Sequence, residues 1–366
     1  MGNITDDIRQ HFDTFAELPF TEADSLALSQ LAYARMPDNV PRYHENAETA
    51  DGMIATVPIH DLLRAECYDD MFGKVWSPSM NVDLLRAMSE SPRWRNLRVG
   101  AYVDEFDAET TKQFSACVFE LGNGTLYVAF RGTDSSIVGW KEDFMMAFRR
   151  PVASQEAAAR YLTELAGHWA GPIMVGGHSK GGNLAVYAAL NAPEKVAERI
   201  TKVYSLDGPG FPSSVVNSPA YAAMMDRIEK IVPDSSIVGM IFETPEPCRV
   251  VRSDQQGPMQ HLAFSWQVNG DDFDYLPEVA HSSQLFNQSL NSWLESMSTE
   301  QRERTVDALF SILHASNTDS ISGLMNAGLK AVPNMIGTFV GLSDEDRRHL
   351  LEAVNLFVSA SLARRR

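Results

Sequence analysis

Residues 173–190, IMVGGHSKGGNLAVYAAL, carry a short apolar run directly into Gly-His-Ser-Lys-Gly and then into a run of small and apolar residues. This order predicts a strand, a sharp turn at Ser179 and a helix, the arrangement called a nucleophile elbow. The turn strains the serine backbone and lifts its hydroxyl above the end of the sheet. Gly177 and Gly181 leave room where strand and helix cross closely. A tight turn that merely needs glycines is the alternative interpretation.

Strand and helix patterns alternate on both sides of this stretch. The Asn-Gly pair at 123–124 lies between two apolar runs and predicts a hairpin. Strands are predicted at 97–104, 114–121, 125–131, 200–206, 228–232, 248–252 and 264–268. Helices are predicted at 21–33, 79–90, 155–169 and 219–227. Strands that alternate with helices form a mixed, centrally parallel sheet covered on both faces, so the fold class is α/β.

The sequence after residue 280 has helical patterns and no strand pattern. Helices are predicted at 281–297, 300–315, 320–331 and 344–362. We expect a C-terminal cap or tail, or a homodimer surface, although plain core packing explains these helices more simply. Polar residues and Pro333 interrupt the apolar segment 321–342, which therefore does not predict a transmembrane helix. The expected domains are an N-terminal helical or irregular segment that packs on the core (1–90), an α/β core (91–297) and a helical C-terminal region (298–366).

The composition is that of an ordinary globular chain. Of its 366 residues 44% are hydrophobic and 22% are charged, which is enough apolar material for a sizeable core. The formal net charge of −17 argues against nucleic acids and anionic membranes as electrostatic partners. Cys67, Cys117 and Cys248 lack metal-type spacing, and the N-terminus lacks the basic and apolar regions of a secretory signal. We therefore expect free thiols and a cytoplasmic protein.

A serine hydroxyl needs a base to remove its proton, and the base needs an acid to hold its tautomer. In folds with a nucleophile elbow the chain order is serine, acid, histidine, so both partners lie after Ser179. The two candidate bases are His261 and His281. His261 lies in a loop between two predicted strands, where a catalytic base belongs, whereas His281 opens a helix beside two serines that resemble capping residues. The context favours His261, and either one is otherwise an ordinary surface histidine.

Two aspartates compete for the role of the acid. Asp234 follows the predicted strand at 228–232, one strand beyond the strand that comes after the elbow helix. Asp207 ends the strand at 200–206 and begins the run Asp-Gly-Pro-Gly. Either carboxylate can reach a base at this edge of the sheet, but Asp207 can instead organise the turn by bonding its backbone. We prefer Asp234 and keep Asp207 as the alternative.

The tetrahedral intermediate of acyl transfer needs two hydrogen-bond donors for its oxyanion. The elbow supplies one of them, the backbone N–H of Lys180. The second belongs in a loop after an earlier strand, and Thr133 follows the predicted strand at 125–131 at the same edge of the sheet. Its N–H and its hydroxyl are both candidates. Gly-Thr-Asp at 132–134 is also a common turn and helix cap.

Residues 130–133 and 177–182, with Trp140 and Asp143, resemble the lipase class 3 family of α/β hydrolases. In that family the position that matches Thr133 is the oxyanion residue, and the position that matches Asp143 hydrogen-bonds to its side chain. The resemblance therefore implies an α/β-hydrolase fold, with Trp140 and Asp143 as supporting residues.

Asp234 and His261 fall where the same family places its acid and its base. Residues 20–33, 233–240 and 260–261 are similar to signatures of the Mbeg1-like lipase relatives of bacteria, and the similarity covers residues 20–297. Lys180 departs from the usual elbow, in which leucine is common at this position. A cation there either binds an anionic group of the substrate or points to solvent.

These residues predict a serine hydrolase that cleaves a carboxylic ester through an acyl-enzyme, with a small-molecule or lipid ester as substrate. Such chemistry needs no metal and no organic cofactor. A catalytically silent hydrolase fold that binds a ligand or partner is the first alternative, because fold does not imply function. An acyltransferase or a thioesterase that uses the same triad is the second.

Overall fold

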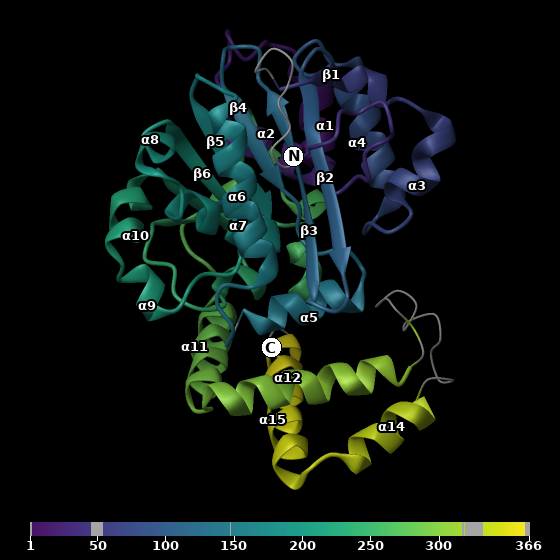
Figure 1. Cartoon of the computed structure of the whole chain (residues 1–366), viewed down its shortest axis with the longest axis vertical. Coiled ribbons are helices and arrows are strands. Elements are labelled where there is room, and N and C mark those ends of the chain that lie inside the picture. The colour runs from purple at the N-terminus through teal and green to yellow at the C-terminus, as the bar shows by residue number, and fades with distance from the viewer. Residues whose placement is uncertain (1, 45–53, 147, 317, 319–331, 363–366) are drawn as a thin grey trace. The chain divides into compact units, whose positions relative to one another are not determined.

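The computed structural model describes residues 2–44, 54–146, 148–316, 318 and 332–362 (Figure 1). The chain forms two compact units. The first contains Met1–Glu105, Phe114–Gly132 and Ser154–Val279, and the second contains Phe106–Gln113, Thr133–Ala153 and Ala280–Arg366.

The central feature is a nine-stranded sheet with the strand order β1-β2-β3-β4-β5-β6-β7-β8-β11. Strands β4 to β8 are parallel, whereas the pairs β1–β2, β3–β4 and β8–β11 are antiparallel. The strands are β1 (Thr56–Pro58), β2 (Arg98–Asp107), β3 (Lys112–Glu120), β4 (Leu126–Phe130), β5 (Ile173–His178), β6 (Ile200–Leu206), β7 (Ile228–Pro233), β8 (Cys248–Val251) and β11 (Tyr275–Leu276). A mixed sheet with a parallel centre is the architecture of the predicted α/β class.

The α-helices of the described residues are α1 (Ile4–Gln10), α2 (Glu22–Leu31), α3 (Tyr68–Phe72), α4 (Pro78–Glu90), α5 (Ile137–Met145), α6 (Ala153–Gly167), α7 (Lys180–Leu190), α8 (Glu194–Ala197), α9 (Ser213–Val216), α10 (Pro219–Met224), α11 (His281–Glu295), α12 (Thr299–His314), α14 (Val332–Gly341) and α15 (Asp344–Leu362). Most of these helices belong to the first unit with the sheet, and α5, α11, α12, α14 and α15 belong to the second unit. No helix in the described ranges is long and apolar enough to cross a bilayer. The helix predicted at 320–331 lies outside the described residues.

Two neighbouring glycines of β5 show how the two faces of the sheet are covered. A Cβ on Gly176 would meet the side chains of Tyr127 and Tyr204, and Tyr127 in turn contacts α2 through a hydrogen bond with Ser25 of 2.7 Å. A Cβ on Gly177 would instead meet the backbone of α7. Because successive residues of a strand point to opposite faces, α2 and α7 cover opposite sides of the parallel strands.

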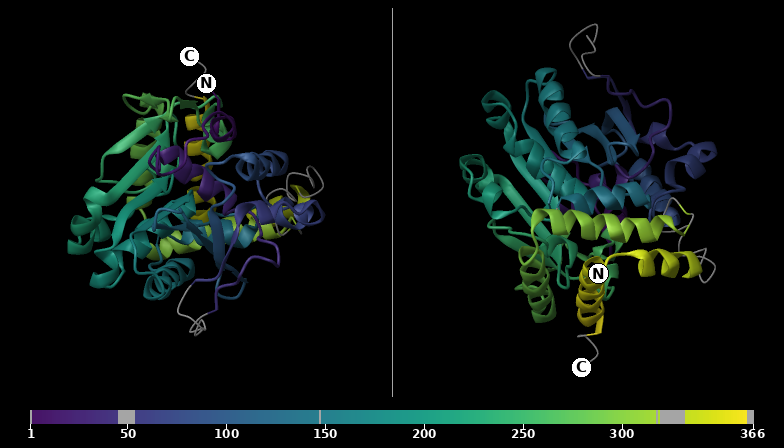
Figure 2. Two further views of the ribbon diagram at one scale, coloured as in Figure 1. Left: turned by 90° about the horizontal axis from the view of Figure 1, so that it is seen from above. Right: turned by 60° about the horizontal axis from the view of Figure 1, so that its bottom comes forward.

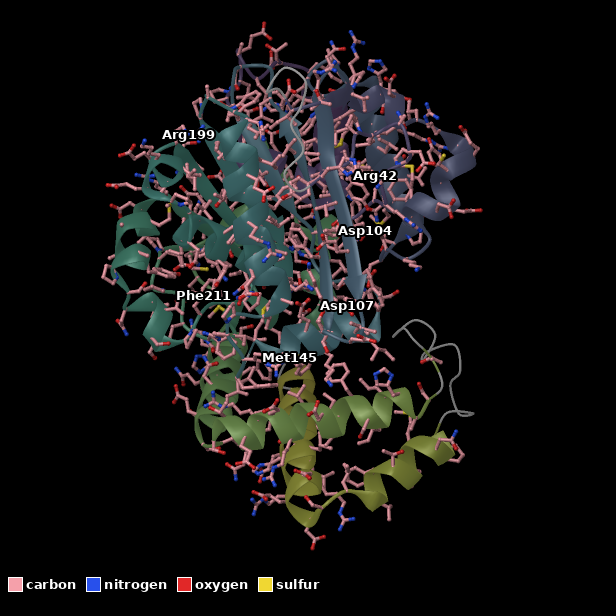
Figure 3. All side chains as sticks on the ribbon, viewed as in Figure 1. Arg42, Asp104, Asp107, Met145, Arg199 and Phe211 are labelled. Atoms are coloured by element: carbon pink, nitrogen blue, oxygen red, sulfur yellow. The ribbon has the colours of Figure 1, made fainter. Side chains whose placement is uncertain are left out.

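One hydrophobic cluster of the core lies on the α2 side of the sheet. It joins apolar residues of α2 and α4 to strand residues such as Tyr127 and Tyr204. On the α7 side, the ring of Tyr161 from α6 packs edge-on against Phe114 and Phe130 at centroid distances of 6.0 and 6.1 Å. Near the end of β4, the buried Arg131 forms an ion pair of 3.1 Å with Asp104 of β2, which Figure 3 labels.

The second unit has a small core of its own. Ile137 of α5 is buried with Val306 and Phe310 of α12. The rings of Phe144 and Phe310 meet edge to face at 5.7 Å, an arrangement that aromatic pairs favour. Helix α12 also runs beside α14, as the right view of Figure 2 shows.

One predicted strand is wrong, and several short strands escaped prediction. The segment 264–268 instead contains a 3-10 turn at Ala263–Ser265 and only the first residue of the two-residue strand β9 (Val268–Asn269), which pairs with β10 (Asp272–Phe273). The apolar residues Phe264 and Trp266 are buried, but they reach the core from turns. The apolar residues of this segment correctly predicted that it is buried, but they incorrectly predicted that it is a strand.

Candidate active site

Ser179 lies between the end of β5 and the start of α7 with backbone angles of φ 61° and ψ −132°. A non-glycine residue rarely adopts such a conformation, so this is the strained turn that the elbow interpretation requires. The Ser179 N–H donates to the Leu206 carbonyl of β6 at 2.9 Å. A Cβ added to Gly181 would lie 2.1 Å from the carbonyl oxygen of Phe130, and one on Gly177 would lie 2.3 Å from the Gly181 carbonyl carbon. These close approaches involve backbone, so neither glycine has room for a side chain.

His261 lies at the end of a 3-10 turn, Gly257–His261, and its side chain is 24% exposed. Its Nδ1 is 2.6 Å from Oδ2 of Asp207, the first residue after β6. A carboxylate can only accept, so Nδ1 carries a proton and the neutral ring keeps Nε2 as its base. This is the pairing between base and acid that a catalytic triad requires.

The carboxylate that the structure places on His261 is that of Asp207, the alternative acid of the sequence analysis. Asp234 follows β7, and its N–H donates to the Val251 carbonyl of β8 at 3.1 Å. Asp207 instead follows β6, which pairs directly with the elbow strand β5. Asp207 is therefore one strand closer to the elbow than Asp234. The Asp207 backbone has a φ of 49°. Because Asp207 holds Nδ1 of His261, it is the aspartate that orients the ring.

The Asp207 carboxylate is fully buried and well supplied with donors. Its Oδ1 accepts from the Ser236 hydroxyl at 2.5 Å and from the Gly239 N–H at 3.0 Å, and its Oδ2 faces His261. Burial opposes ionisation, but the hydrogen bond and charge of His261 and then the Ser236 hydroxyl outweigh it, so the pKa of Asp207 lies below its ordinary value. Asp207 is therefore a fixed anion beneath the histidine.

The segments that carry the acid and the base are tied down by side chains. Asn183 of α7 donates to the carbonyls of Pro209 and Gly210, both at 3.1 Å, and so holds the turn that follows Asp207. Gln260, which precedes the base, accepts from the Ser235 N–H at 2.8 Å. Its own carbonyl accepts from the Trp266 indole at 2.9 Å. The positions of both catalytic candidates are thus set by contacts distant in sequence.

The buried Lys230 of β7 is a supporting residue that the sequence analysis missed. Its ammonium donates to the carbonyl of Gly208, the residue after Asp207. Burial lowers its pKa, while the nearby Glu246 opposes that shift. Tyr221 donates to Glu246 at 2.6 Å, so the carboxylate is held in place as well. The available signal was a lysine in the middle of the apolar run at 228–232. This signal was ambiguous, because a solvent-exposed face of the strand explains such a residue equally well.

The two proposed oxyanion residues belong to different units. Lys180 is the first residue of α7, and its 2% exposure rules out the interpretation that its side chain points to solvent. Thr133 belongs to the second unit, where its hydroxyl donates to Oδ2 of Asp143 at 2.5 Å. Trp140, on the same helix as Asp143, packs against the core of that unit. His281, the less favoured candidate base, begins α11.

His178 and Tyr33 were not among the predicted site residues. His178 directly precedes the nucleophile candidate and is 5% exposed. Its Nε2 is 2.7 Å from the His261 carbonyl oxygen, and its Nδ1 is 3.1 Å from the Tyr33 hydroxyl. Burial, and then the charge of His261, lower the pKa of His178 to about 3. A histidine within an elbow motif is an ambiguous signal, because its neighbours come from distant parts of the chain.

This buried histidine predicts a loss of stability in acid. In the unfolded chain His178 has the ordinary histidine pKa of about 6.5. Between about pH 6.5 and pH 3 the unfolded chain therefore binds a proton at His178, whereas the folded protein does not. Lowering the pH from 7 to 5 therefore costs about 2 kcal/mol through this residue, and above pH 7 its contribution is constant. Urea unfolding at pH 7 and 5 measures the loss. The variant His178→Phe should lose less stability over this interval than the parent, and equal losses would contradict the assignment.

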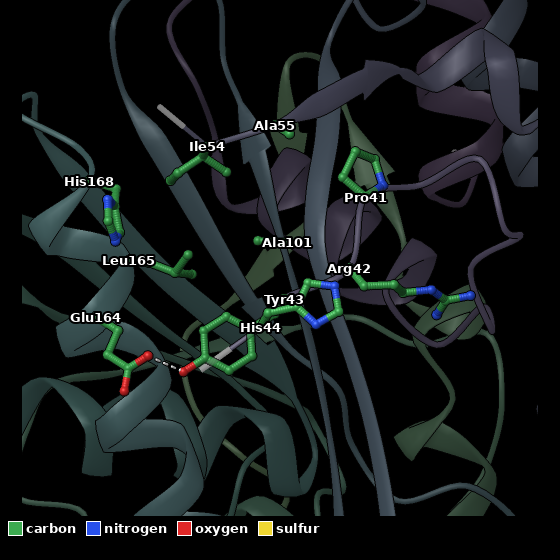
Figure 4. A pocket seen from close by; sticks show the side chains of 10 residues that line it. All are labelled: Pro41, Arg42, Tyr43, His44, Ile54, Ala55, Ala101, Glu164, Leu165 and His168. Atoms are coloured by element: carbon green, nitrogen blue, oxygen red, sulfur yellow. Dashed lines mark hydrogen bonds between the residues drawn. The ribbon is translucent and has the colours of Figure 1, made fainter. Parts of the chain in front are cut away.

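A cavity of about 340 Å³ lies elsewhere in the first unit (Figure 4). Tyr43 and Glu164 face each other in it through a hydrogen bond of 2.5 Å, and Leu165 and Ala101 supply apolar lining. Ser179, Asp207 and His261 are not among its lining residues. This cavity is therefore separate from the candidate active site.

The elbow serine, the paired histidine and aspartate and the mixed sheet define a lipase-like α/β protein. Residues 88–311 match the profile of the Mbeg1-like family, which is more than half of the chain. The protein belongs to this lipase-like family, and the resemblance seen in the sequence is confirmed.

Comparison with solved structures gave lipases at low overall similarity. The M37 lipase is 19% identical with a TM-score of 0.37, over 60% of this chain and 70% of that chain. The Rhizomucor miehei lipase propeptide complex is 17% identical with a TM-score of 0.33, over 64% of this chain and 82% of that chain. A search among curated proteins gave no match.

Proposed function

We propose that this protein is a serine hydrolase that cleaves a carboxylic ester through Ser179, His261 and Asp207. The observation that carries the proposal is the hydrogen bond of 2.6 Å between His261 Nδ1 and the buried Asp207. The proposed nucleophile is a serine held at a φ of 61° between a parallel strand and a helix, which supports the elbow interpretation. Membership of a lipase-like family supports the choice of an ester as the bond that is cleaved.

In the first half of the reaction, the Ser179 hydroxyl oxygen attacks the carbonyl carbon of the ester while His261 Nε2 takes its proton. Asp207 stabilises the resulting imidazolium and keeps the ring in place. The backbone N–H groups of Lys180 and Thr133 stabilise the oxyanion of the tetrahedral intermediate. Collapse of this intermediate breaks the bond to the leaving alcohol, which receives the proton from His261.

In the second half, water attacks the acyl-enzyme and His261 accepts a proton from that water. The second tetrahedral intermediate then releases the carboxylic acid, and Ser179 regains its proton. The Asp143 carboxylate accepts the Thr133 hydroxyl proton at 2.5 Å, which holds the Thr133 side chain and leaves its backbone N–H as the proposed second donor. The proposed substrate is a small-molecule or lipid ester. The role of region 298–366 as a cap or dimer surface and the cytoplasmic location remain predictions from the sequence.

Labelling with a fluorophosphonate tests the nucleophile directly. An activated serine attacks the phosphorus and expels fluoride, which leaves a stable adduct. We expect one adduct per chain, located by mass spectrometry on the peptide that contains Ser179 and absent after heat denaturation. A known serine hydrolase in the same tube serves as the positive control. Labelling of that enzyme without labelling of Ser179 would support a catalytically silent hydrolase fold instead.

A further inference from the structure

The ring of His178 bridges two segments that are far apart in sequence. Its Nε2 lies 2.7 Å from the main-chain carbonyl of His261, and its Nδ1 lies 3.1 Å from the Tyr33 hydroxyl. A carbonyl oxygen only accepts, so Nε2 must carry the proton. Nδ1 of the neutral ring is then an acceptor, and the Tyr33 hydroxyl must donate to it. These two contacts leave one tautomer for His178.

The same ring also lies against the side chain of His261. The two ring centroids are 4.6 Å apart with an interplanar angle of 34°. During the proposed reaction His261 becomes positively charged, and a second charged imidazole at this distance would repel it. Burial and the charge of His261 both keep the pKa of His178 low, at about 3, so His178 stays neutral while His261 cycles. A neutral neighbour that donates to the main chain can therefore support the base without competing for its proton.

Tyr33 brings the N-terminal segment into this arrangement. It follows α2 and is 7% exposed. A Cβ added to Gly132 would lie 2.0 Å from the Tyr33 hydroxyl oxygen, so the hydroxyl is wedged between the backbone after β4 and the ring of His178. Only a glycine at position 132 leaves space for it. One phenol thus contacts both the elbow and the residue that precedes Thr133.

We propose that Tyr33 and His178 are positioning residues for the catalytic base: the Tyr33 hydroxyl holds His178 as its Nε2–H tautomer, and this N–H fixes the main chain of His261. The inference rests on the proposed function, because it assigns the role of base to His261. It does not depend on the substrate. The inference also gives the N-terminal segment a role in the reaction. The sequence does not reveal this role, because Tyr33 lies far along the chain from the triad residues.

The variant Tyr33→Phe removes only the hydroxyl and keeps the ring. We expect kcat for p-nitrophenyl butyrate and the rate of fluorophosphonate labelling to fall about tenfold, with KM within twofold, because a displaced base slows proton transfer more than it weakens binding. Tyr161→Phe is the matched control, since it removes another buried phenol, one that donates to the Ala101 carbonyl at 2.7 Å. If Tyr33 had a purely structural role, Tyr33→Phe and Tyr161→Phe would have the same kcat and labelling rate when they lose the same amount of stability.

Nitrogen NMR of ¹⁵N-histidine-labelled protein gives a readout that needs no activity. In the parent, His178 should show a protonated Nε2 and a hydrogen-bonded, unprotonated Nδ1 at every pH from 5 to 8. In Tyr33→Phe the Nδ1 signal should move downfield, and the ring signals of His261 should change more than they do in Tyr161→Phe. If His261 responds equally in the two variants, the positioning role is overturned. If the parent is not labelled by the fluorophosphonate but His261 still responds selectively, the ester hydrolase assignment fails while the coupling stands.

Discussion

Replacing Ser179 with alanine is expected to reduce kcat for p-nitrophenyl butyrate by at least about 10⁴-fold, because no acyl-enzyme can form without the hydroxyl. The residual rate over water would come from the oxyanion donors and from substrate binding. The alanine keeps a Cβ at the strained position, so the backbone at φ 61° carries the same steric cost in both proteins. The loss should therefore appear in kcat and not in the urea midpoint of unfolding.

Ser214→Ala is a suitable control for Ser179→Ala, since Ser214 is an exposed serine on α9. It should retain the parental rate. Circular dichroism of both variants would establish that each is folded. Equal rates in Ser179→Ala and the parent would contradict the proposed nucleophile, whatever the absolute activity is.

The variant Asp207→Asn is expected to lower kcat by about 10³- to 10⁴-fold. The amide preserves the shape of the side chain, but it removes the negative charge that stabilises the imidazolium and it permits the wrong tautomer of His261. Asparagine also tolerates a positive φ better than most residues, so the backbone angle of 49° at this position does not complicate the result. The measurement is the kcat of the folded variant, with KM determined in the same titration.

Asp234→Asn is the matched comparison, because it makes the same chemical change one strand further along the sheet. We expect it to lower kcat less than tenfold. Fluorophosphonate labelling should slow strongly in Asp207→Asn and little in Asp234→Asn. The opposite ranking would restore Asp234 as the acid and would mean that the pairing of 2.6 Å between Asp207 and His261 is not the catalytic one.

The elbow and the parallel centre of the sheet were predictable from the sequence because both are local patterns. An apolar run, a turn of glycines around Ser179 and a small-residue helix are consecutive in the chain, and the structure has β5 and α7 directly on either side of Ser179. The Asn-Gly hairpin was equally local, and β3 and β4 pair across it. Short-range spacing decided each of these elements.

Which aspartate pairs with His261 was not predictable in the same way. Asp207 and Asp234 both follow an apolar strand, and both satisfy the order of serine, acid and histidine. The difference lies in the left-handed turn at Asp207 and in the donors that Ser236 and Gly239 provide. Those donors lie about 30 residues further along the chain, so a local pattern does not reveal them. Tyr33 was hidden for the same reason, since 145 residues separate it from His178.

The second unit is assembled from separate stretches of the chain, and this has a consequence for how the protein can be cut. A fragment that ends at residue 279 would keep α5 but lose α12, which would leave Ile137 and Phe144 without the partners that cover them. Such a fragment would expose apolar side chains and tend to aggregate. The helices after residue 280 are therefore not a detachable appendage, and insertions or deletions there would also be felt by the segment that begins at Thr133.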